Sequence, residues 1–279
     1  MSTPYVAVHF TLNPVVPYAE ILLAELSVFS FESFEETETG LVAYVKEGAT
    51  DLSVLGTLSL IDNEAVAIAY EVKRIAPQNW NADWEKDFTP VIVNERCRVR
   101  ASFHPAGTYP LELVINPKMS FGTGHHETTA LMLSHLLEID CTAWRVLDMG
   151  CGTGVLGIAA MRLGATEVLG VDIEPWCIEN THENALLNDC PTLEAIQQNE
   201  VPANRGMFDC VIANINRNVL LEQMADYARI TRVGGKVLLS GFYKKDLAVI
   251  SYQMTTLGYR LNSSKEKHDW MAVLFDFQG

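Results

Sequence analysis

The sequence predicts an α/β chain with two domains of unequal size, and two patterns carry this prediction. Over residues 1–75, strand-like and helix-like segments follow in the order β-α-β-β-α-β, the split arrangement of ferredoxin-like α+β domains. Beyond residue 90, apolar strands alternate with amphipathic helices, which is typical of a parallel, Rossmann-like sheet covered by helices. We therefore expect a small domain over residues 1–75, a linker over 76–90 and a larger domain over 91–279.

The elements of the small domain are marked by alternating apolar residues and by residues that favour helix starts or turns. Pro17 opens an apolar-periodic stretch, Gly40 lies in a turn, and Asp51 can cap a helix. The expected elements are a strand over 5–11, a helix over 18–26, a hairpin of 31–36 with 41–45, a short helix over 51–60 and a strand over 65–75.

The linker carries three aromatic residues, Trp80, Trp84 and Phe88, at intervals of four. This spacing places them along one face of a helix. The simplest interpretation is a linker helix whose aromatic stripe packs between the two domains.

In the larger domain, plausible helix stops such as Gly164 and Gly258 separate strands from helices. Three short strands are expected first, over 91–93, 98–101 and 111–115. Five longer strands follow over 145–149, 167–172, 209–214, 236–241 and 270–275, with helices over 130–137, 155–163, 175–187, 219–230 and 245–257.

Composition and charge limit the classes of function. The 279 residues are 48% hydrophobic, and the six cysteines form no C-x-x-C pair, so neither a disulfide framework nor a zinc site is indicated. No signal-like or membrane-spanning segment is visible, so we expect a soluble, cytoplasmic protein. The net charge of -15 argues against direct binding to nucleic acid.

The negative charge is concentrated at the start of the chain. Residues 1–75 hold eleven acidic residues against Lys46, Lys73 and Arg74, a formal charge of -8. A solvated acidic surface and a docking face for a basic protein explain this equally well.

A glycine-rich loop follows the strand that ends near Asp148. Gly150, Gly152 and Gly154 allow a sharp turn and close approach of a ligand, but residues 152–157 also fit the dinucleotide pattern G-x-G-x-x-G. Asp148 favours S-adenosylmethionine over NAD, because a carboxylate there would attract the methionyl ammonium and repel a pyrophosphate. Asp172 closes the next strand and can accept hydrogen bonds from ribose hydroxyls of either cofactor.

Two further segments are expected near the same site. Asn214 ends a buried strand where open α/β sheets bind ligands, while Asn218 is explained as a cap of the next helix. Thr129 lies at the start of an apolar helix, where a hydroxyl can satisfy backbone donors or reach a ligand. The adjacent His125 and His126 point apart and have no matching Cys or His pair, so we expect no metal site.

These segments resemble the methyltransferases that modify ribosomal protein L11 of the bacterial large subunit, over nearly the whole chain. The motifs that carry the resemblance are Asn-Trp-Asn at 79–81, Trp-Glu at 84–85, FGTGHHETT at 121–129, the glycine loop at 148–154, Asp-Ile-Glu-Pro-Trp at 172–176 and NINRN at 214–218. The resemblance implies a ferredoxin-like substrate-recognition domain before a seven-stranded class I methyltransferase domain. It also implies that Thr129, Gly150, Asp172 and Asn214 contact S-adenosylmethionine.

The implied reaction transfers methyl groups to lysine ε-amines and the N-terminal α-amine of the ribosomal protein, up to trimethylation. Asn214 is the expected catalytic residue, because its amide or the strand-end carbonyls can accept hydrogen bonds from the amine. We expect a monomer that acts on the ribosomal protein free of the ribosome, with no membrane or nucleic-acid partner. The alternatives are a methyltransferase for another amine, an NAD-dependent oxidoreductase and a non-catalytic binding module.

Overall fold

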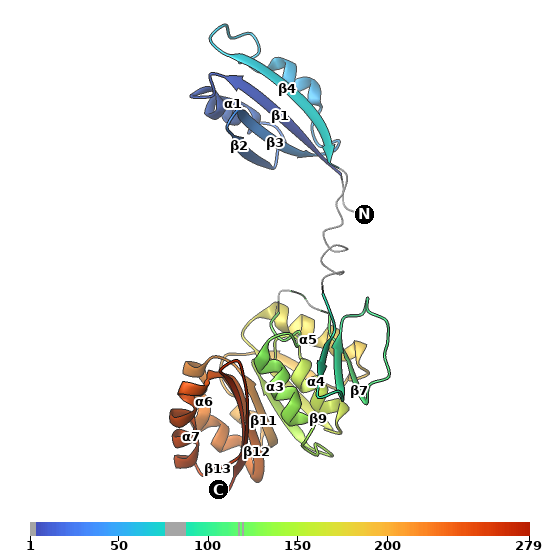
Figure 1. The fold of residues 1–279 in the computed structure, drawn as a ribbon, viewed down its shortest axis with the longest axis vertical. Helices are drawn as coiled ribbons and strands as arrows, with labels where there is room; N and C mark the ends of the chain where they lie inside the picture. Colours follow the sequence, from blue (N-terminus) through green and yellow to red (C-terminus); the bar gives the residue numbers. More distant parts are fainter. Residues whose placement is uncertain (1–3, 76–87, 117, 119) are drawn as a thin grey trace. The chain divides into compact units, whose positions relative to one another are not determined.

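The computed structural model describes residues 4–75, 88–116, 118 and 120–279. The chain divides into two compact units, Met1–Asp87 and Phe88–Gly279 (Figure 1). Most of the linker helix expected over 76–90, including Trp80 and Trp84, lies outside the described residues. Residues 88–90 are described and are not helical.

The first unit contains one antiparallel sheet in the order β2-β3-β1-β4. Helix α1 packs on it through the fully buried Leu22 and Leu26. The short helix expected over 51–60 is a 3-10 helix that ends earlier, where Leu58 is extended. Asp51 caps its start as expected, because its Oδ1 accepts the Ser53 N–H at 3.0 Å. The elements are β1 (Tyr5–Asn13), α1 (Tyr18–Leu26), β2 (Ser33–Thr37), β3 (Gly40–Lys46), η1 (Leu52–Thr57) and β4 (Ala67–Ile75).

The second unit is built on a seven-stranded mixed sheet in the order β10-β9-β8-β11-β12-β14-β13. The first five strands in this order run parallel, and β14 is antiparallel to both β12 and β13. Strands β10 and β13 were not among the expected elements. The strands are β8 (Arg145–Met149), β9 (Glu167–Asp172), β10 (Glu194–Gln197), β11 (Phe208–Asn214), β12 (Thr231–Tyr243), β13 (Tyr259–Lys267) and β14 (Trp270–Phe277).

Helices cover both faces of this sheet (Figure 1). Helices α3, α4 and α5 lie on one face, and α6 and α7 lie on the other, each group over its own cluster of buried apolar residues. Their bounds are α3 (Glu127–Leu136), α4 (Val155–Arg162), α5 (Pro175–Leu187), α6 (Arg217–Ile230) and α7 (Leu247–Thr256), with the 3-10 helices η2 (Ala203–Arg205) and η3 (Lys244–Asp246). Within the described part of the chain, no helix is long and apolar enough to cross a bilayer.

A small three-stranded sheet adjoins the α3 and α4 side of this core. Its strands are β5 (Val91–Val93), β6 (Cys97–Arg100) and β7 (Leu111–Val114). In the large sheet, the strand order reverses between β8 and β11, so their carboxyl ends open on the crevice where α/β sheets bind ligands.

Candidate active site

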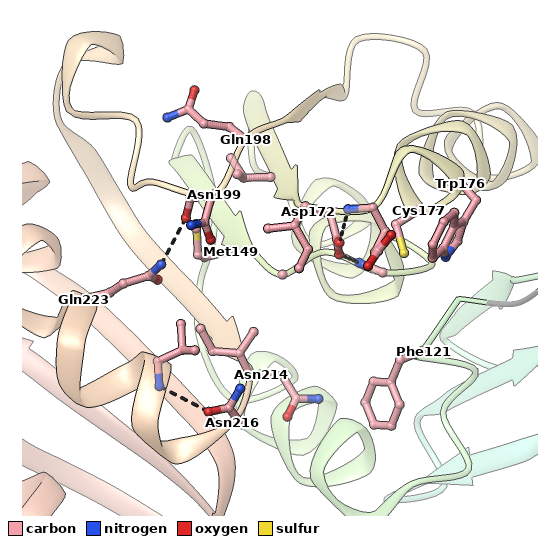
Figure 2. A pocket seen from close by; sticks show the side chains of 17 residues that line it. Phe121, Met149, Asp172, Trp176, Cys177, Gln198, Asn199, Asn214, Asn216 and Gln223 are labelled. Atoms are coloured by element: carbon pink, nitrogen blue, oxygen red, sulfur yellow. Dashed lines mark hydrogen bonds between the residues drawn. The ribbon is translucent and has the colours of Figure 1, made fainter.

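A cavity of about 450 Å³ lies at this crevice. Its walls come from the glycine loop, the end of β9, the residues after β10 and the end of β11. In Figure 2, Phe121 and Asn214 lie on one side of this space, and Gln198 and Asn199 lie on the other. Of the predicted cofactor-binding residues, the cavity is lined by Gly150, Gly152, Asp172 and Asn214.

The glycine loop needs its glycines for internal packing as well as for its turn. Gly150 and Gly152 have φ values of +73° and +55°, which favour glycine. A Cβ on Gly150 would lie 2.2 Å from a methyl group of Ile215, and one on Gly152 would lie 2.3 Å from the Phe121 carbonyl oxygen. Gly154 faces Thr181 in the same way at 2.9 Å and does not line the cavity. The loop therefore packs tightly against the segments that carry Phe121 and Ile215.

Asp172 stands at the cavity wall with a fixed carboxylate. Its Oδ2 accepts the Gly152 N–H at 2.9 Å, and its Oδ1 accepts the Glu174 N–H at 3.1 Å. Each carboxylate oxygen has a second lone pair, so both can still accept a ligand hydroxyl. This arrangement fits the predicted contact with a ribose.

Asp148 lies behind the cavity rather than on its wall, with 1% of its surface exposed. Its Oδ2 accepts the Gly157 N–H at 2.8 Å, while its Oδ1 has no hydrogen-bond partner among the described residues. Burial raises the pKa of the Asp148 carboxyl to about 7, and the nearby Asp172 carboxylate adds to the rise. A cationic partner would therefore be favourable at this oxygen.

Asn214 ends β11 and reaches the cavity with an oriented amide. Its Nδ2 donates to the Thr129 hydroxyl at 3.4 Å, and Thr129 is fully buried and does not line the cavity. The predicted cap of the following helix is wrong by two residues. Asn216, not Asn218, caps α6, because its Oδ1 accepts the N–H groups of Asn218 (3.1 Å) and Val219 (3.2 Å).

A second cavity of about 270 Å³ adjoins the first. The two cavities share four lining residues, Phe121, Asn214, Ile215 and Asn216. The other residues around the second cavity are His126, Thr128, Gly241 and Trp270. Asn214 therefore stands where two separate ligands could meet.

Aromatic rings extend from the first cavity along the second. The ring centroid of His126 lies 5.3 Å from that of Phe121 and 4.9 Å from that of Trp270. On the far side of Trp270, the ring centroid of Tyr243 lies 4.0 Å from that of Trp270. His126 is also the N-cap of α3, since its Nδ1 accepts the Thr128 N–H at 3.3 Å. These contacts hold the ring of His126 between the helix and the cavity.

His125 and His126 have separate neighbours. The His125 ring packs on Phe88, with 4.5 Å between ring centroids, and its Nε2 lies 2.8 Å from the Thr89 carbonyl oxygen. Among the described residues, no group of three or more His, Cys, Asp or Glu side chains is arranged to hold a metal ion.

Several residues around the two cavities were not assigned to the site from the sequence. Phe121 opens the FGTGHHETT motif, and Trp176 ends the motif that begins at Asp172, so membership of these motifs could have suggested both residues. Gln198 and Asn199 follow β10, a strand that was not expected. Trp270 opens β14, far from the other motifs, and no sequence signal connects it with them.

Comparison with known proteins identifies the family of this chain. The family model described as ribosomal protein L11 methyltransferase (PrmA) matches residues 18–278. A protein named ribosomal protein L11 methyltransferase from Porphyromonas gingivalis is 45% identical, over 92% of this chain and 90% of that protein. Another of the same name from Phocaeicola vulgatus is 38% identical, over 97% and 98%.

The fold also matches a solved structure. The crystal structure of a ribosomal protein L11 methylase from Lactobacillus delbrueckii subsp. bulgaricus aligns with a TM-score of 0.63 at 23% identity, covering 69% of this chain and all of that chain. This likeness supports an α/β methyltransferase fold. On the strength of the family match and its close relatives, the chain belongs to the ribosomal protein L11 methyltransferase (PrmA) family.

Proposed function

We propose that this protein transfers methyl groups from S-adenosylmethionine to amines of ribosomal protein L11, namely lysine ε-amines and the N-terminal α-amine. The observation that carries the proposal is the pair of cavities that share Phe121, Asn214, Ile215 and Asn216. One cavity takes the cofactor and the other takes the amine, so the reacting atoms meet beside Asn214. Family membership supports the protein substrate.

The cofactor is S-adenosylmethionine, and the residues of the first cavity fit it. Apolar side chains such as Met149, Val171 and Val219 can pack on an adenine ring, and Asp172 can accept hydrogen bonds from the ribose. The free Oδ1 of Asp148 can attract the ammonium group directly or through water. Gly150 and Gly152 bring backbone close to the ligand, while the predicted contacts of Thr129 and Gly154 with it stay predictions.

When bound, the cofactor supplies an activated methyl group on a sulfonium. Asn214 holds the amine for it, because the bond from Nδ2 to Thr129 turns the amide so that Oδ1 can accept a hydrogen bond from the amine. Thr129 thus positions the catalytic side chain from within the core. An amine held in this way keeps its lone pair in line with the methyl group, and positioning supplies much of the acceleration.

The aromatic side chains beside Asn214 lower the free energy needed to deprotonate the substrate ammonium. A lysine amine with a pKa of about 10.4 in water is mostly protonated at pH 7. The Phe121, His126 and Trp270 rings replace water around it, which disfavours the cation and lowers its pKa. Both an ε-amine and an α-amine can use such a cavity.

We propose that the first unit, over residues 1–75, is a ferredoxin-like domain that binds the substrate. The sheet order β2-β3-β1-β4 supports this fold. Its three basic side chains, Lys46, Lys73 and Arg74, are all paired with glutamates, which leaves eight acidic residues to attract a basic protein. A variant without residues 1–75 should therefore lose most activity on intact L11. Full activity would contradict this role.

Methylation of purified ribosomal proteins tests the proposed function directly. With S-adenosylmethionine present, mass spectrometry should find added methyl groups on lysine ε-amines and the α-amine of L11 and on no other protein of the large subunit. Methylation of a different protein, or of no protein, would contradict the substrate assignment.

We further propose that the enzyme acts as a monomer in the cytosol on L11 free of the ribosome. The net charge of -15 supports this, because assembled ribosomal RNA would repel the protein. Free L11 should be methylated faster than L11 in intact large subunits, and the enzyme should elute as a monomer. Equal rates on the two substrates would contradict the preference.

A further inference from the structure

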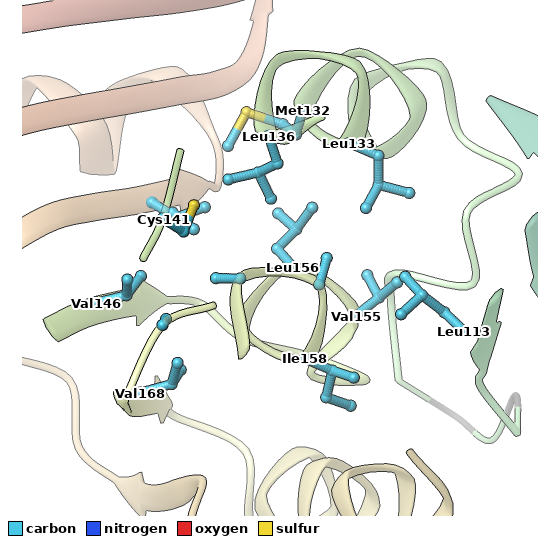
Figure 3. Packing of buried hydrophobic residues seen from close by; sticks show 14 of the residues in the cluster. Leu113, Met132, Leu133, Leu136, Cys141, Val146, Val155, Leu156, Ile158 and Val168 are labelled. Atoms are coloured by element: carbon cyan, nitrogen blue, oxygen red, sulfur yellow. The ribbon is translucent and has the colours of Figure 1, made fainter. Parts of the chain in front are cut away.

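Helix α5 turns a polar face into the interior of the protein. Asn180, Thr181 and Asn184 are fully buried, and Asn188 is 2% exposed. The neighbouring helix α4 differs, because its buried residues are apolar or small and it packs among Leu113, Leu133 and Val168 (Figure 3). Buried amides cost free energy unless they form hydrogen bonds, so the partners of the α5 face explain why it is polar.

The partners of Asn184 lie on the two chain segments that flank the first cavity. Its Oδ1 accepts the Asn116 N–H at 2.9 Å, and its Nδ2 donates to the Thr153 carbonyl at 2.9 Å. Asn116 leads into the segment that carries Phe121, and Thr153 belongs to the glycine loop. Both ends of one amide therefore join the two segments, and Asn180 adds a bond from its Nδ2 to the Asn116 carbonyl at 3.3 Å.

Thr153 carries the connection to the cavity wall. Its N–H donates to the Phe121 carbonyl at 2.9 Å, and its hydroxyl donates to the Gly122 carbonyl at 2.6 Å. Phe121 lines both cavities. The hydrogen bonds thus run from Asn116 through Asn184 and Thr153 to Phe121.

We propose that Asn184 is a positioning residue for methyl transfer. By joining the Asn116 N–H to the Thr153 carbonyl, it holds the segment that carries Phe121 against the glycine loop and sets the shape of the cofactor cavity. Only an amide of this length offers both an acceptor and a donor here, since aspartate lacks the donor and leucine lacks both. Asn184 itself does not line either cavity.

Asn188 provides a matched comparison on the same helix face. Its Oδ1 accepts the Val114 N–H at 2.8 Å, and its Nδ2 donates to the Val114 carbonyl at 2.7 Å. Val114 ends β7 and does not line either cavity. The Asn188 Nδ2 also donates to the Asn184 backbone carbonyl at 2.7 Å. Removing either amide leaves buried backbone groups unpaired, but only the Asn184 side chain bonds to the glycine loop.

The test compares Asn184→Ala with Asn188→Ala by calorimetric titration of S-adenosylmethionine into the full-length protein. We expect both variants to lose thermal stability. Asn184→Ala should raise the dissociation constant about tenfold or more, which corresponds to the loss of one or two hydrogen bonds that shape the site. Asn188→Ala should leave the dissociation constant within about twofold, because its side chain bonds only β7 and the backbone carbonyl of Asn184 and leaves both hydrogen bonds of the Asn184 side chain in place. Equal dissociation constants for the two variants would overturn the proposal.

Two more variants keep the test decisive if Asn184→Ala does not fold. Asn184→Asp keeps the acceptor and loses the donor, and Thr153→Val removes only the bond to the Gly122 carbonyl. Both should weaken cofactor binding in the same direction, and KM for the cofactor should rise more than kcat falls. Wild-type affinity in both would overturn the proposal.

The inference rests on the proposed use of the first cavity for S-adenosylmethionine, and the titration of the wild-type protein separates the two. If the wild-type protein does not bind the cofactor, the proposed function fails. If it binds and the Asn184 variants bind equally well, only the positioning role fails.

Discussion

The cavity beside Asp172 and the cavity beside Trp270 share the end of β11 but are built from different parts of the chain. Around Asp172, main-chain groups are fixed by directional hydrogen bonds, such as that from the Gly152 N–H. Around Trp270, three of the lining side chains are rings that contact one another, those of Phe121, His126 and Trp270. In the proposed assignment of the two cavities, directional bonds suit a cofactor that never varies, whereas ring contacts tolerate amines of different length and methylation state.

The border between the two cavities should be the most sensitive place. Asn214→Ala removes the group that we propose holds the amine in line, so kcat should fall about 10²–10³-fold, as for other lost transition-state hydrogen bonds. Initial rates at saturating cofactor and L11 measure this, with circular dichroism to verify folding. Thr129→Val should cause part of the same loss. Unchanged turnover of Asn214→Ala would remove this residue from the mechanism.

On the cofactor side, Asp172→Ala should weaken S-adenosylmethionine binding about 10- to 100-fold, because hydrogen bonds to a carboxylate are lost. Calorimetric titration gives the affinity, and KM for L11 should stay near the wild-type value. Asp172→Asn retains one acceptor and should bind more tightly than the alanine variant. The ribose contact is excluded if the alanine variant binds with wild-type affinity.

On the acceptor side, Trp270→Ala should raise KM for L11 about 2- to 10-fold, since one aromatic contact with the substrate is lost. Cofactor affinity should not change, which is the opposite of the result expected for Asp172. Trp270→Phe serves as the matched control, and its KM for L11 should stay close to the wild-type value. A variant that loses cofactor affinity instead would show that the two cavities are not separate.

The last prediction concerns stability rather than activity, at Asp148, which lies behind the cofactor side. Burial raises the pKa of the Asp148 carboxyl in the folded state to about 7, above its ordinary value of 3.8, so the folded state holds an extra proton between these two pH values. In the cofactor-free protein, the contribution of Asp148 to the free energy of unfolding is fully present below about pH 3.8 and is lost as the pH rises through 7. Asp148→Asn cannot ionise, so it should gain stability relative to wild type between pH 5 and pH 8. Urea unfolding of both proteins at pH 5 and pH 8 measures this gain. If the difference in the free energy of unfolding between variant and wild type were the same at both pH values, the prediction would be contradicted.

Much of the larger unit was predictable because its strands are apolar and its helices periodic. Strands β8 and β9 were predicted with the bounds that the structure has. Strand β13 was missed because it is a polar edge strand, with Asn262, Ser263 and Ser264 in its middle. Strand β10 has only four residues, too few for a clear alternation.

The candidate site was predictable only where it coincides with a strand end. Asp172 and Asn214 follow from this rule. The partners of Asn184 and the meeting of His126 with Trp270 depend on tertiary packing between segments far apart in the sequence. Local pattern carries no information about such pairs.

The cap of α3 has a consequence for the path of the proton released in the reaction. Because Nδ1 of His126 accepts the Thr128 N–H, the neutral ring carries its hydrogen on Nε2, so that nitrogen is a donor. A ring that gained a proton on Nδ1 would give up this cap, which disfavours it as the base for an amine in the second cavity. In the proposed mechanism deprotonation is then left to water before the amine binds beside Asn214, and the rate should follow the titration of the substrate amine.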